Sequence, residues 1–460
     1  MPKIQRWALF TALCLPLFSP ASSNPESTTA FVGATLIDAT GSPRPNAVIL
    51  VKGDRITAVG NRDEVPIPSE AQVFDASGKW IVPGLIDAHI HFFQSGGLYT
   101  RPDVIDLRNV RPYAEEIAWI RQRIPATLAR YLASGVTSVM DVGGPFWTFD
   151  VRELANRTKT APRVAVAGPL VATYVPSALQ VDDPPLIKVS SPEESRIAVR
   201  RVLARHPDLV KFWFIPLPGQ SLATQSAVVR AAIETSHAAG VRVVVHATQL
   251  DVARAAVEVG ADILAHSVED RRVDEAFVQR LKERNVLYVT TIVVNEGYHE
   301  VLGQKVKLTD IERHLGDPEV IATFDELRRL PVWKKAWAFV WPDPKVMSWN
   351  LKRLQQGGVT IAAGTDAGNI GTLHGPALHR ELELMAEAGL SPREILIAAT
   401  QGGARVMGRR DDLGTIEKGK LADFLLLDAD PLADITHLRR IYRVVKGGMI
   451  FDSQGLVGKK

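Results

Sequence analysis

Residues 81–91 read Ile-Val-Pro-Gly-Leu-Ile-Asp-Ala-His-Ile-His, an apolar run that ends in two histidines. Such a run is typical of a buried strand, and side chains in a strand return to the same side every second residue. His89 and His91 therefore point the same way. Two neutral imidazoles on one face can hold a metal ion, whereas two unrelated neighbouring histidines have no such role. The pair needs partners from elsewhere in the chain.

Apolar runs with strand character recur through the middle of the chain, separated by helical patterns. This alternation is the signature of βα units and a parallel sheet. The eight runs are IVPGLIDA, GVTSVMDV, RVAVAG, LVKFWF, VRVVVHA, ADILAHS, VLYVTTI and GVTIAAGTD. Eight parallel strands close a (β/α)8 barrel. We therefore expect the α/β fold class, with a TIM-like barrel over residues 83–402.

Both flanks of the barrel segment have a different pattern, with short strands joined by turn residues. Residues 29–82 contain AVILVKGDRITAVG, which predicts a hairpin at Gly53-Asp54. Residues 403–457 contain LADFLLLDAD and IYRVVKGGMIFDSQG, which predict further strands. We expect the two flanks to pair with each other and form one small β-sandwich.

The first 23 residues have the pattern of a secretory signal peptide: a basic start, the apolar stretch WALFTALCLPLF, and small residues at Ala21-Ser22-Ser23. The apolar stretch is too short for a comfortable permanent membrane anchor. We therefore expect a secreted or periplasmic protein. Cleavage would remove Cys14, the only cysteine, and would exclude disulfides, thiolate metal sites and a cysteine nucleophile.

The overall charge gives no sign of a polyanionic partner. The formal net charge is +3, and lysine and arginine residues at the two chain ends account for much of it. The folded body is close to neutral, which predicts no nucleic-acid or membrane-surface patch. We expect a small-molecule substrate, and the sequence leaves open whether the chain forms homo-oligomers.

Four further candidate ligands lie on or just after predicted barrel strands: Lys211, His246, His266 and Asp366. Each alone has an ordinary explanation, as a core histidine, a turn-capping aspartate or a lysine that extends to the surface. Their shared position is informative, because the active sites of such barrels lie at the carboxyl ends of the strands. Together with the histidine pair they predict a metal site.

The sequence resembles the amidohydrolase superfamily of metal-dependent hydrolases. The matching segments are PGLIDAHIH, GVTSVMDVGG, VKFWF, VVVHA, AHSVED, AAGTDAG, LHGPALHRELELMAEAGLSPREILIAAT and GTIEKGKLADFLLLDADPL. They occur in the family's order and span essentially the whole chain after the signal segment. The resemblance is greatest to the branch of imidazolonepropionase-like and Xaa-Pro dipeptidase-like, or prolidase-like, members.

This resemblance implies a binuclear metal centre. It makes His89 and His91 ligands of the more buried ion, and His246 and His266 ligands of the other. Lys211 matches a lysine that carbon dioxide converts to a carbamate bridging both ions, which is chemically reasonable because a desolvated amine is neutral. Zinc is the metal favoured by imidazole-rich ligation without thiolates, with manganese and iron as alternatives.

The resemblance also implies the reaction. Two divalent ions can hold a bridging hydroxide near neutral pH and polarise a carbonyl oxygen. Asp366 matches an aspartate that contacts a metal, takes a proton from the attacking water and delivers it to the leaving nitrogen. The expected activity is hydrolysis of an amide-like carbon–nitrogen bond in a dipeptide or a non-peptide substrate.

Two further segments bear on the substrate. His374, on the loop after the eighth strand, is a candidate substrate contact. Residues 292–358 are too long for a simple connection and carry four tryptophans, Trp333, Trp337, Trp341 and Trp349, so they predict a helical insert or a lid over the barrel mouth. The segment after the third strand lacks the Gly/His-rich loop of dipeptidase-like relatives, which puts prolidase activity in doubt.

Three alternative functions remain at this stage. A prolidase-like metallodipeptidase would use the same residues on a different substrate. A mononuclear deaminase of the same superfamily does without the bridging lysine, so Lys211 disfavours it. A binding barrel without catalysis has no need of the full ligand set together with Asp366.

Overall fold

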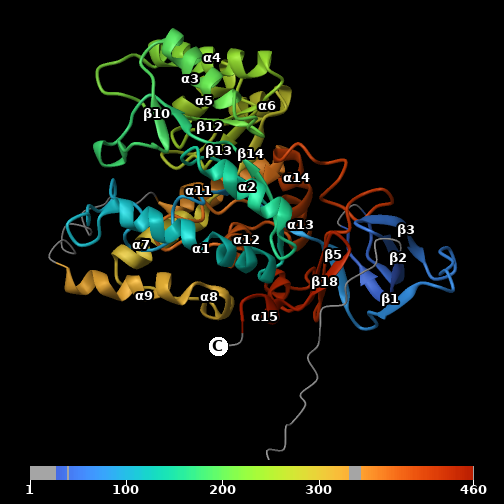
Figure 1. The fold of residues 1–460 in the computed structure, drawn as a ribbon. Helices are drawn as coiled ribbons and strands as arrows, with labels where there is room; N and C mark the ends of the chain where they lie inside the picture. The colour runs from blue at the N-terminus through green and yellow to red at the C-terminus, as the bar shows by residue number, and fades with distance from the viewer. Residues whose placement is uncertain (1–26, 39–40, 331–342, 459–460) are drawn as a thin grey trace, which may run out of the picture.

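The computed structural model describes residues 27–38, 41–330 and 343–458. The expected signal segment with Cys14 lies outside these residues, as do Trp333, Trp337 and Trp341 of the insert. Within them the chain forms an α/β barrel with a β-sandwich beside it (Figure 1). Among the same residues, no helix has the length and hydropathy needed to cross a membrane.

Strands occupy both flanks and the middle of the chain. Their bounds are β1 (Thr28–Leu36), β2 (Arg44–Lys52), β3 (Arg55–Asn61), β4 (Gln72–Asp75), β5 (Trp80–Pro83), β6 (Leu85–Ile90), β7 (Val136–Asp141), β8 (Arg163–Val166), β9 (Leu170–Ala172), β10 (Leu186–Lys188), β11 (Val210–Trp213), β12 (Val243–His246), β13 (Ile263–Ala265), β14 (Leu287–Val289), β15 (Ile361–Ala362), β16 (Phe424–Leu427), β17 (Ile441–Lys446) and β18 (Met449–Phe451).

Helices fill the connections between the barrel strands. Their bounds are α1 (Tyr113–Ala133), α2 (Thr148–Arg157), α3 (Pro192–Leu203), α4 (Leu222–Ala238), α5 (Leu250–Glu258), α6 (Glu275–Glu283), α7 (Ile292–Leu302), α8 (Asp310–Leu315), α9 (Pro318–Glu326), α11 (Pro344–Gln356), α12 (Ala377–Glu387), α13 (Pro392–Ile397), α14 (Gly403–Val406) and α15 (Ser453–Leu456). Short turns of other helix types are η1 (Ser177–Leu179), η2 (Leu327–Arg329), η3 (Ala398–Gly402) and η4 (Ile435–Arg439).

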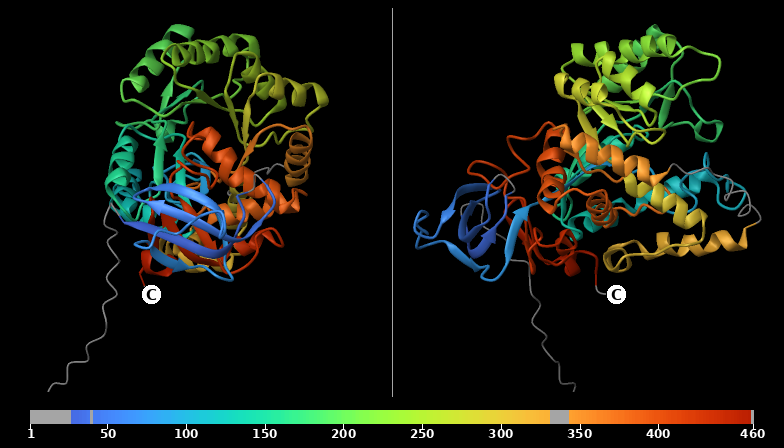
Figure 2. Two further views of the ribbon diagram at one scale, coloured as in Figure 1. Left: turned by 90° about the vertical axis from the view of Figure 1, so that its right-hand side faces the viewer. Right: turned by 180° about the vertical axis from the view of Figure 1, so that it is seen from behind.

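The sandwich joins the two ends of the chain, as the sequence predicts. Its strands run in the order β18-β17-β16-β5-β1-β2-β3, with β4 added beside β1. The central contact is between β16 and β5, which brings residues 424–427 against residues 80–83. Phe31 and Phe424 meet edge to face in its core, with ring centroids 5.0 Å apart. The strands β1 to β3 lie at one end of the molecule (Figures 1 and 2).

The apolar run at residues 81–90 is divided between the two sheets. Its first part forms β5 of the sandwich, and its second part forms β6, the first barrel strand. Proline and glycine separate them: Pro83 has no N–H to continue a ladder. A Cβ on Gly84 would lie 2.2 Å from the Thr137 hydroxyl of β7, so only glycine fits this close approach. One expected strand is therefore two.

The barrel has eight strand positions in the predicted order: β6, β7, β8 continued by β9, β11, β12, β13, β14 and β15. Every pair is parallel. The ring closes through a hydrogen bond from the Ala88 N–H on β6 to the Ala363 carbonyl after β15, at 3.0 Å. Between β8 and β11, the Asp208 N–H donates to the Val166 carbonyl at 2.9 Å.

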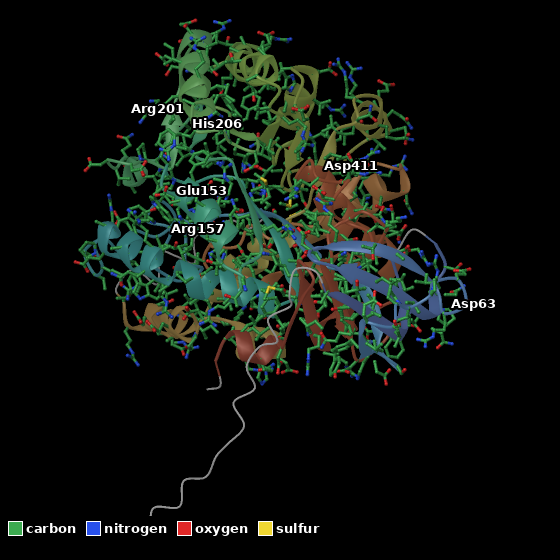
Figure 3. All side chains as sticks on the ribbon, turned by 45° about the vertical axis from the view of Figure 1, so that its right-hand side comes forward. Asp63, Glu153, Arg157, Arg201, His206 and Asp411 are labelled. Atoms are coloured by element: carbon green, nitrogen blue, oxygen red, sulfur yellow. The ribbon has the colours of Figure 1, made fainter. Side chains whose placement is uncertain are left out.

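Local signals set several helix starts. A capping box starts α13, where the Ser391 hydroxyl accepts from the Glu394 N–H and the Glu394 carboxylate accepts from the Ser391 N–H. The described part of the 292–358 insert is helical, with α7 lining the barrel mouth and α9 packed on the loop that follows β6. Charged side chains of both signs, including Glu153, Arg157 and Arg201, cover the outer helices (Figure 3).

Candidate metal centre

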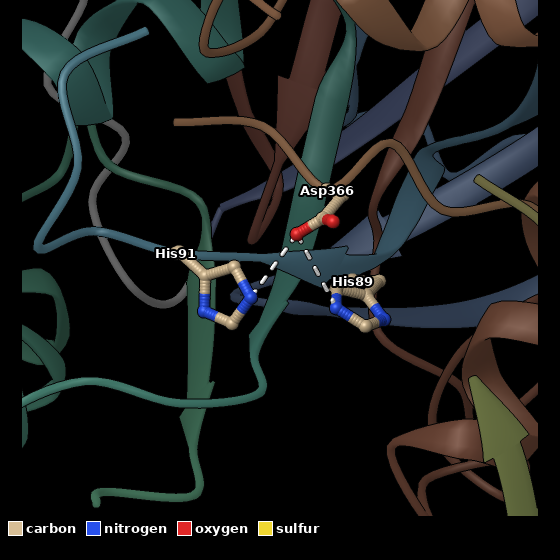
Figure 4. Close-up of side chains that lie close together, drawn as sticks. All are labelled: His89, His91 and Asp366. Carbon is tan, nitrogen blue, oxygen red and sulfur yellow. Dashed lines mark ion pairs between the residues drawn. The ribbon is translucent and has the colours of Figure 1, made fainter. Parts of the chain in front are cut away.

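Three of the predicted ligands meet where the barrel closes. His89 lies on β6, His91 directly follows this strand, and Asp366 follows β15. A ligand atom from each of the three lies within 4.8 Å of the others. The Asp366 carboxylate sits between the imidazoles, 3.1 Å from His91 Nε2 and 3.5 Å from His89 Nε2 (Figure 4). We call these residues the first half of the site.

Backbone hydrogen bonds hold this half together. The Asp366 N–H donates to the His89 carbonyl at 2.8 Å, and the His91 N–H donates to the Ala367 carbonyl at 2.8 Å. The close approach depends on Gly364, where a Cβ would lie 2.8 Å from the Cβ of His89. Asp366 itself has φ +59°, a left-handed conformation that is rare outside glycine and collects at functional sites.

The buried Asp87 side chain stabilises the same junction between β6 and the segment that carries Asp366. Its carboxylate accepts hydrogen bonds from the N–H and the hydroxyl of Thr365 at 3.1 and 2.7 Å, and from the His89 N–H at 3.3 Å. Burial raises the pKa of Asp87 to about 7, and these hydrogen bonds oppose that rise. The buried carboxyl thus ties the first strand to the segment that carries Asp366.

The histidines of this half are oriented for ligation. His91 Nδ1 lies 2.7 Å from the Gly143 carbonyl, so Nδ1 carries the proton and Nε2 presents its lone pair to the site. Both ring nitrogens of His89 are buried and have no hydrogen-bond partner within the described ranges of the chain. Burial holds the pKa of His89 well below its usual range, so the ring is neutral at pH 7.

The second half of the site comes from three other strands of the ring. Lys211 lies on β11, His246 ends β12, and His266 directly follows β13. The imidazole centroids of His246 and His266 are 4.5 Å apart, and His266 is also 4.5 Å from His89. His266 Nδ1 bonds the Thr291 hydroxyl at 2.9 Å. Burial lowers the pKa of His266 to about 3 and that of His246 well below its usual range.

Lys211 is the most unusual member. Its side chain is 1% exposed, and its Nζ has no hydrogen-bond partner among the described residues. Burial lowers the pKa of Lys211 to about 7, so a large fraction of the amine is neutral near neutral pH. A buried amine without a partner is costly for a fold, which indicates that another group completes this site.

The six residues fit a pair of divalent cations. Neutral imidazoles and a carboxylate are the donors that such ions accept. Among the described residues, both nitrogens of His89 and Nζ of Lys211 are buried without a hydrogen-bond partner, and Asp366 Oδ1 faces His91 Nε2 and His89 Nε2 at 3.1 and 3.5 Å. The structure thus brings together all six predicted ligands at the carboxyl ends of the barrel strands.

Five of these residues, His91, Lys211, His246, His266 and Asp366, form the floor of a cavity of about 430 Å³, and His89 is buried beside His91 and His266. One wall is apolar and consists of Leu170, Leu179, Leu186 and Trp213. Another wall is polar and includes Arg101, Tyr298 and Asn369, whose side chains bond one another.

Sequence reasoning missed both walls of this cavity. Trp213 could have been found, because it lies two residues after Lys211 on the same strand and so faces the same way. Arg101 stands in a long loop and carries no pattern that would have found it.

His374 does not join the others. It is buried beside Phe92 and outside the cavity lining, with its Nε2 donating to the Gln94 carbonyl and its Nδ1 accepting from the Tyr131 hydroxyl, both at 2.7 Å. Burial lowers its pKa to about 4. Because both ring nitrogens are engaged within the protein, this placement does not fit the expected substrate contact.

Comparison with known proteins agrees with this geometry. The profile of the Amidohydrolase family matches residues 80–451, which include the whole barrel and the C-terminal strands. The chain belongs to the amidohydrolase family. It is therefore a hydrolase that acts on carbon–nitrogen bonds, in a family that generally uses divalent metal ions.

Relatives with different names match most of the chain. Imidazolonepropionase of Streptomyces griseus is 25% identical over 426 residues, which cover 86% of this chain and 88% of the relative. Ochratoxinase of Aspergillus niger is 24% identical over 487 residues, 95% of this chain and 89% of the relative. The structure of a Xaa-Pro dipeptidase with bound methionine superposes with a TM-score of 0.70 at 24% identity, covering 93% of this chain and 100% of that one.

Proposed function

We propose that this amidohydrolase uses a binuclear metal centre to hydrolyse an amide-like carbon–nitrogen bond in a small molecule. The observation that carries the proposal is the convergence of six predicted ligands at one end of the barrel, where five of them line one cavity and the side-chain nitrogens of His89 and Lys211 are buried without a hydrogen-bond partner among the described residues. A fold gains nothing from burying such atoms unless a bound group satisfies them.

Each half of the site would hold one ion: His89, His91 and Asp366 the first, and His246 and His266 the second, with Lys211 shared. Zinc is the proposed metal because the donors are mainly imidazoles and no thiolate is present. When bound, the two ions supply Lewis acidity that activates water and polarises the scissile carbonyl.

Lys211 would enter the site as a carbamate. Its neutral amine attacks carbon dioxide, a nitrogen–carbon bond forms, and one N–H proton leaves to solvent, so a neutral side chain becomes an anion with two oxygens. The proposal rests on the burial of Lys211 and the lowered pKa of its amine. The alternative mononuclear deaminase would leave this buried lysine without a role.

Asp366 would manage the protons. Its carboxylate lies at the centre of the first half and borders the cavity, within reach of both a water on the floor and a substrate above it. It accepts a proton from the attacking water, and the resulting carboxylic acid gives that proton to the nitrogen as the carbon–nitrogen bond breaks. The leaving group departs as a neutral amine.

The cavity favours a small substrate with an apolar part. A volume of about 430 Å³ suits a molecule of dipeptide or drug-like size, and Leu170, Leu179, Leu186 and Trp213 offer an apolar surface to it. The relatives include an imidazolonepropionase, an ochratoxinase and a Xaa-Pro dipeptidase, and these names support either a dipeptide or a non-peptide amide as the substrate. A prolidase-like dipeptidase is the second candidate, supported by the superposition on a Xaa-Pro dipeptidase.

The test combines metal analysis with substrate screening. Purified protein loaded with zinc in bicarbonate buffer is assayed against dipeptides, N-acyl amino acids, lactams and carbamates, while its metal content is measured by mass spectrometry. We expect two equivalents per chain and turnover within one of these classes. One equivalent together with deamination of an aminated heterocycle would contradict the proposal, and preference for Xaa-Pro dipeptides would select the second candidate.

A further inference from the structure

The polar wall of the cavity contains a half-buried arginine whose hydrogen bonds are almost all made within the protein. Arg101 lies in the loop of residues 91–112 after β6. Its Nε and Nη2 bind the Asp103 carboxylate in a bidentate pair at 2.8 and 2.7 Å. Its Nη1 donates to the Tyr298 hydroxyl at 2.7 Å and to the Asn369 side-chain oxygen.

This pattern makes Arg101 a poor anchor for a substrate anion. A guanidinium has five N–H groups, and four hydrogen bonds to protein groups leave about one of them. Asp103 also neutralises its charge at contact distance. An arginine that waits for a carboxylate or phosphate would present an open pair of donors to the cavity.

Asn369 connects this arginine to the metal centre. Its side-chain oxygen receives hydrogen bonds from Arg101 and from the Tyr298 hydroxyl, the latter at 2.6 Å. Because both partners donate a hydrogen bond, the atom that they contact is the amide oxygen, and the amino group of Asn369 points the other way. The other end, Nδ2, donates to the Asp366 backbone carbonyl at 2.9 Å. Asn369 is 1% exposed, so this chain of bonds runs through the protein interior.

The carbonyl that Asn369 holds belongs to the strained residue of the site. Asp366 has φ +59°, a conformation that a residue with a side chain keeps only when its surroundings impose it. Rotation about the N–Cα bond of Asp366 moves its carbonyl and its Cβ together, so a hydrogen bond that holds this carbonyl resists a change in φ. The orientation of the carboxylate toward His89 and His91 depends on the same torsion.

We propose that Arg101, Tyr298 and Asn369 form a positioning clamp that holds Asp366 in its left-handed conformation and so aims its carboxylate. Arg101 and Tyr298 orient the amide of Asn369, and Asn369 holds the Asp366 carbonyl. The clamp rests on the proposed function only in that Asp366 is the proton carrier. It gives the insert a role, because Tyr298 belongs to α7.

The loop that carries Arg101 is itself anchored on neighbouring helices. The Tyr99 hydroxyl donates to Glu326 of α9, and the Leu98 N–H donates to the Thr323 hydroxyl at 3.0 Å. The Ser95 hydroxyl donates to Glu116 of α1 at 2.7 Å. These contacts hold the backbone around Arg101, so the clamp reaches the site from a fixed base.

The sharpest test uses Asn369→Asp. This variant keeps an oxygen for Arg101 and Tyr298 but removes the side-chain N–H that reaches the Asp366 carbonyl at 2.9 Å, and it leaves only the longer bond from the backbone N–H of residue 369 at 3.3 Å. We expect kcat to fall about 10²-fold, the loss that accompanies a small misplacement of a reacting group, with KM changed less than about 3-fold. Chelator should also remove metal from this variant several-fold faster than from the wild type, because Asp366 is a proposed ligand.

Arg101→Ala should show the same split, and combining it with Asn369→Asp should cost little more than either change alone, since both break one chain of contacts. Tyr298→Phe should show a smaller loss. The matched control is Arg163→Ala, which removes another bidentate Arg–Asp pair, to Asp423 on the sandwich side of the barrel at 2.6 and 3.0 Å. It should lower the melting temperature and leave kcat and KM unchanged.

Several results would overturn the clamp. A rise in KM with unchanged kcat in Arg101→Ala would make Arg101 a substrate contact, and fully additive losses in the double variant would separate it from Asn369. If Asn369→Asp keeps the wild-type kcat while Asp366→Asn is inactive, the clamp is overturned but the proposed function is not. Full activity of Asp366→Asn would instead overturn the proposed function. If Arg101→Ala fails to fold, Asn369→Asp and Tyr298→Phe still decide the question.

Discussion

The two halves of the site are built differently. The first half, His89, His91 and Asp366, is assembled by backbone hydrogen bonds across the closing seam of the barrel and already contains its anionic ligand. The second half comes from three consecutive strands, β11, β12 and β13, and consists of Lys211, His246 and His266. It contains two neutral imidazoles beside a buried amine.

This difference indicates how each half acquires a metal. The first half offers a carboxylate at the distances a cation needs, so it is ready for an ion when the barrel closes. The second half lacks an anion of its own until Lys211 changes chemically. We therefore expect the first half to depend on backbone geometry and the second on carbon dioxide.

The largest effect is expected from Asp366→Asn, which strikes the group that serves both metal binding and proton transfer. We expect turnover to fall by about 10²- to 10⁴-fold, the usual contribution of a general acid–base group. Metal content should stay close to that of the wild type, because the amide oxygen can still coordinate. Steady-state kinetics and metal analysis check this, and unchanged turnover would remove the proton-transfer role.

Lys211→Met should damage the second half selectively. The variant keeps an unbranched apolar chain of similar length but has no amine to carboxylate. We expect no more than one metal equivalent per chain and a loss of turnover of about 10²-fold, as for the removal of several kcal/mol of Lewis-acid stabilisation. Two equivalents in this variant, measured by mass spectrometry, would refute the bridging role.

Gly364→Ala should damage the first half selectively. Its new Cβ would lie 2.8 Å from the His89 Cβ, and such overpacking typically costs about 1–3 kcal/mol. We expect weaker binding of one ion while the other is retained, seen by metal titration alongside denaturant unfolding. Gly455→Ala in α15 is the control, since its Cβ would meet no atom closer than 3.7 Å. If both variants bound metal equally well, the close packing of Gly364 against His89 would not be what holds the first half of the site together.

The smallest effect is expected from Leu179→Ala on the apolar wall, which touches neither half. Loss of part of an apolar contact is worth about 1–3 kcal/mol in substrate discrimination, so KM for the best substrate should rise about 10-fold. The metal content should not change. Val181→Ala, nearby but 41% exposed and outside the cavity lining, should leave KM as it is. A rise in KM in both would place the substrate elsewhere.

The ligand set could be predicted because it follows strand geometry. Alternating βα units imply a closed ring, and a ring brings the carboxyl ends of its strands together whatever the loops do. His89, Lys211, His246, His266 and Asp366 all lie at or next to such ends. The pairing of both chain flanks into a sandwich could likewise be expected, because isolated short strands need partners.

Loop positions could not be predicted in the same way. His374 follows the eighth strand just as Asp366 does, yet it turns away and bonds Tyr131 and the Gln94 carbonyl. The division of residues 81–90 between two sheets was also missed, because a buried strand reads the same in either sheet. Only the close contact at Gly84 shows where the chain passes from one to the other.

The sequence by itself determined the fold class, the family resemblance and the six residues of the candidate metal centre. Strand periodicity and the order of motifs can be recognised in the amino-acid sequence alone. Only the tertiary structure decided the walls of the cavity and the support of Asp366 by Arg101, Tyr298 and Asn369. These three residues come from separate loops and helices, and contacts between such segments depend on packing that no local pattern encodes.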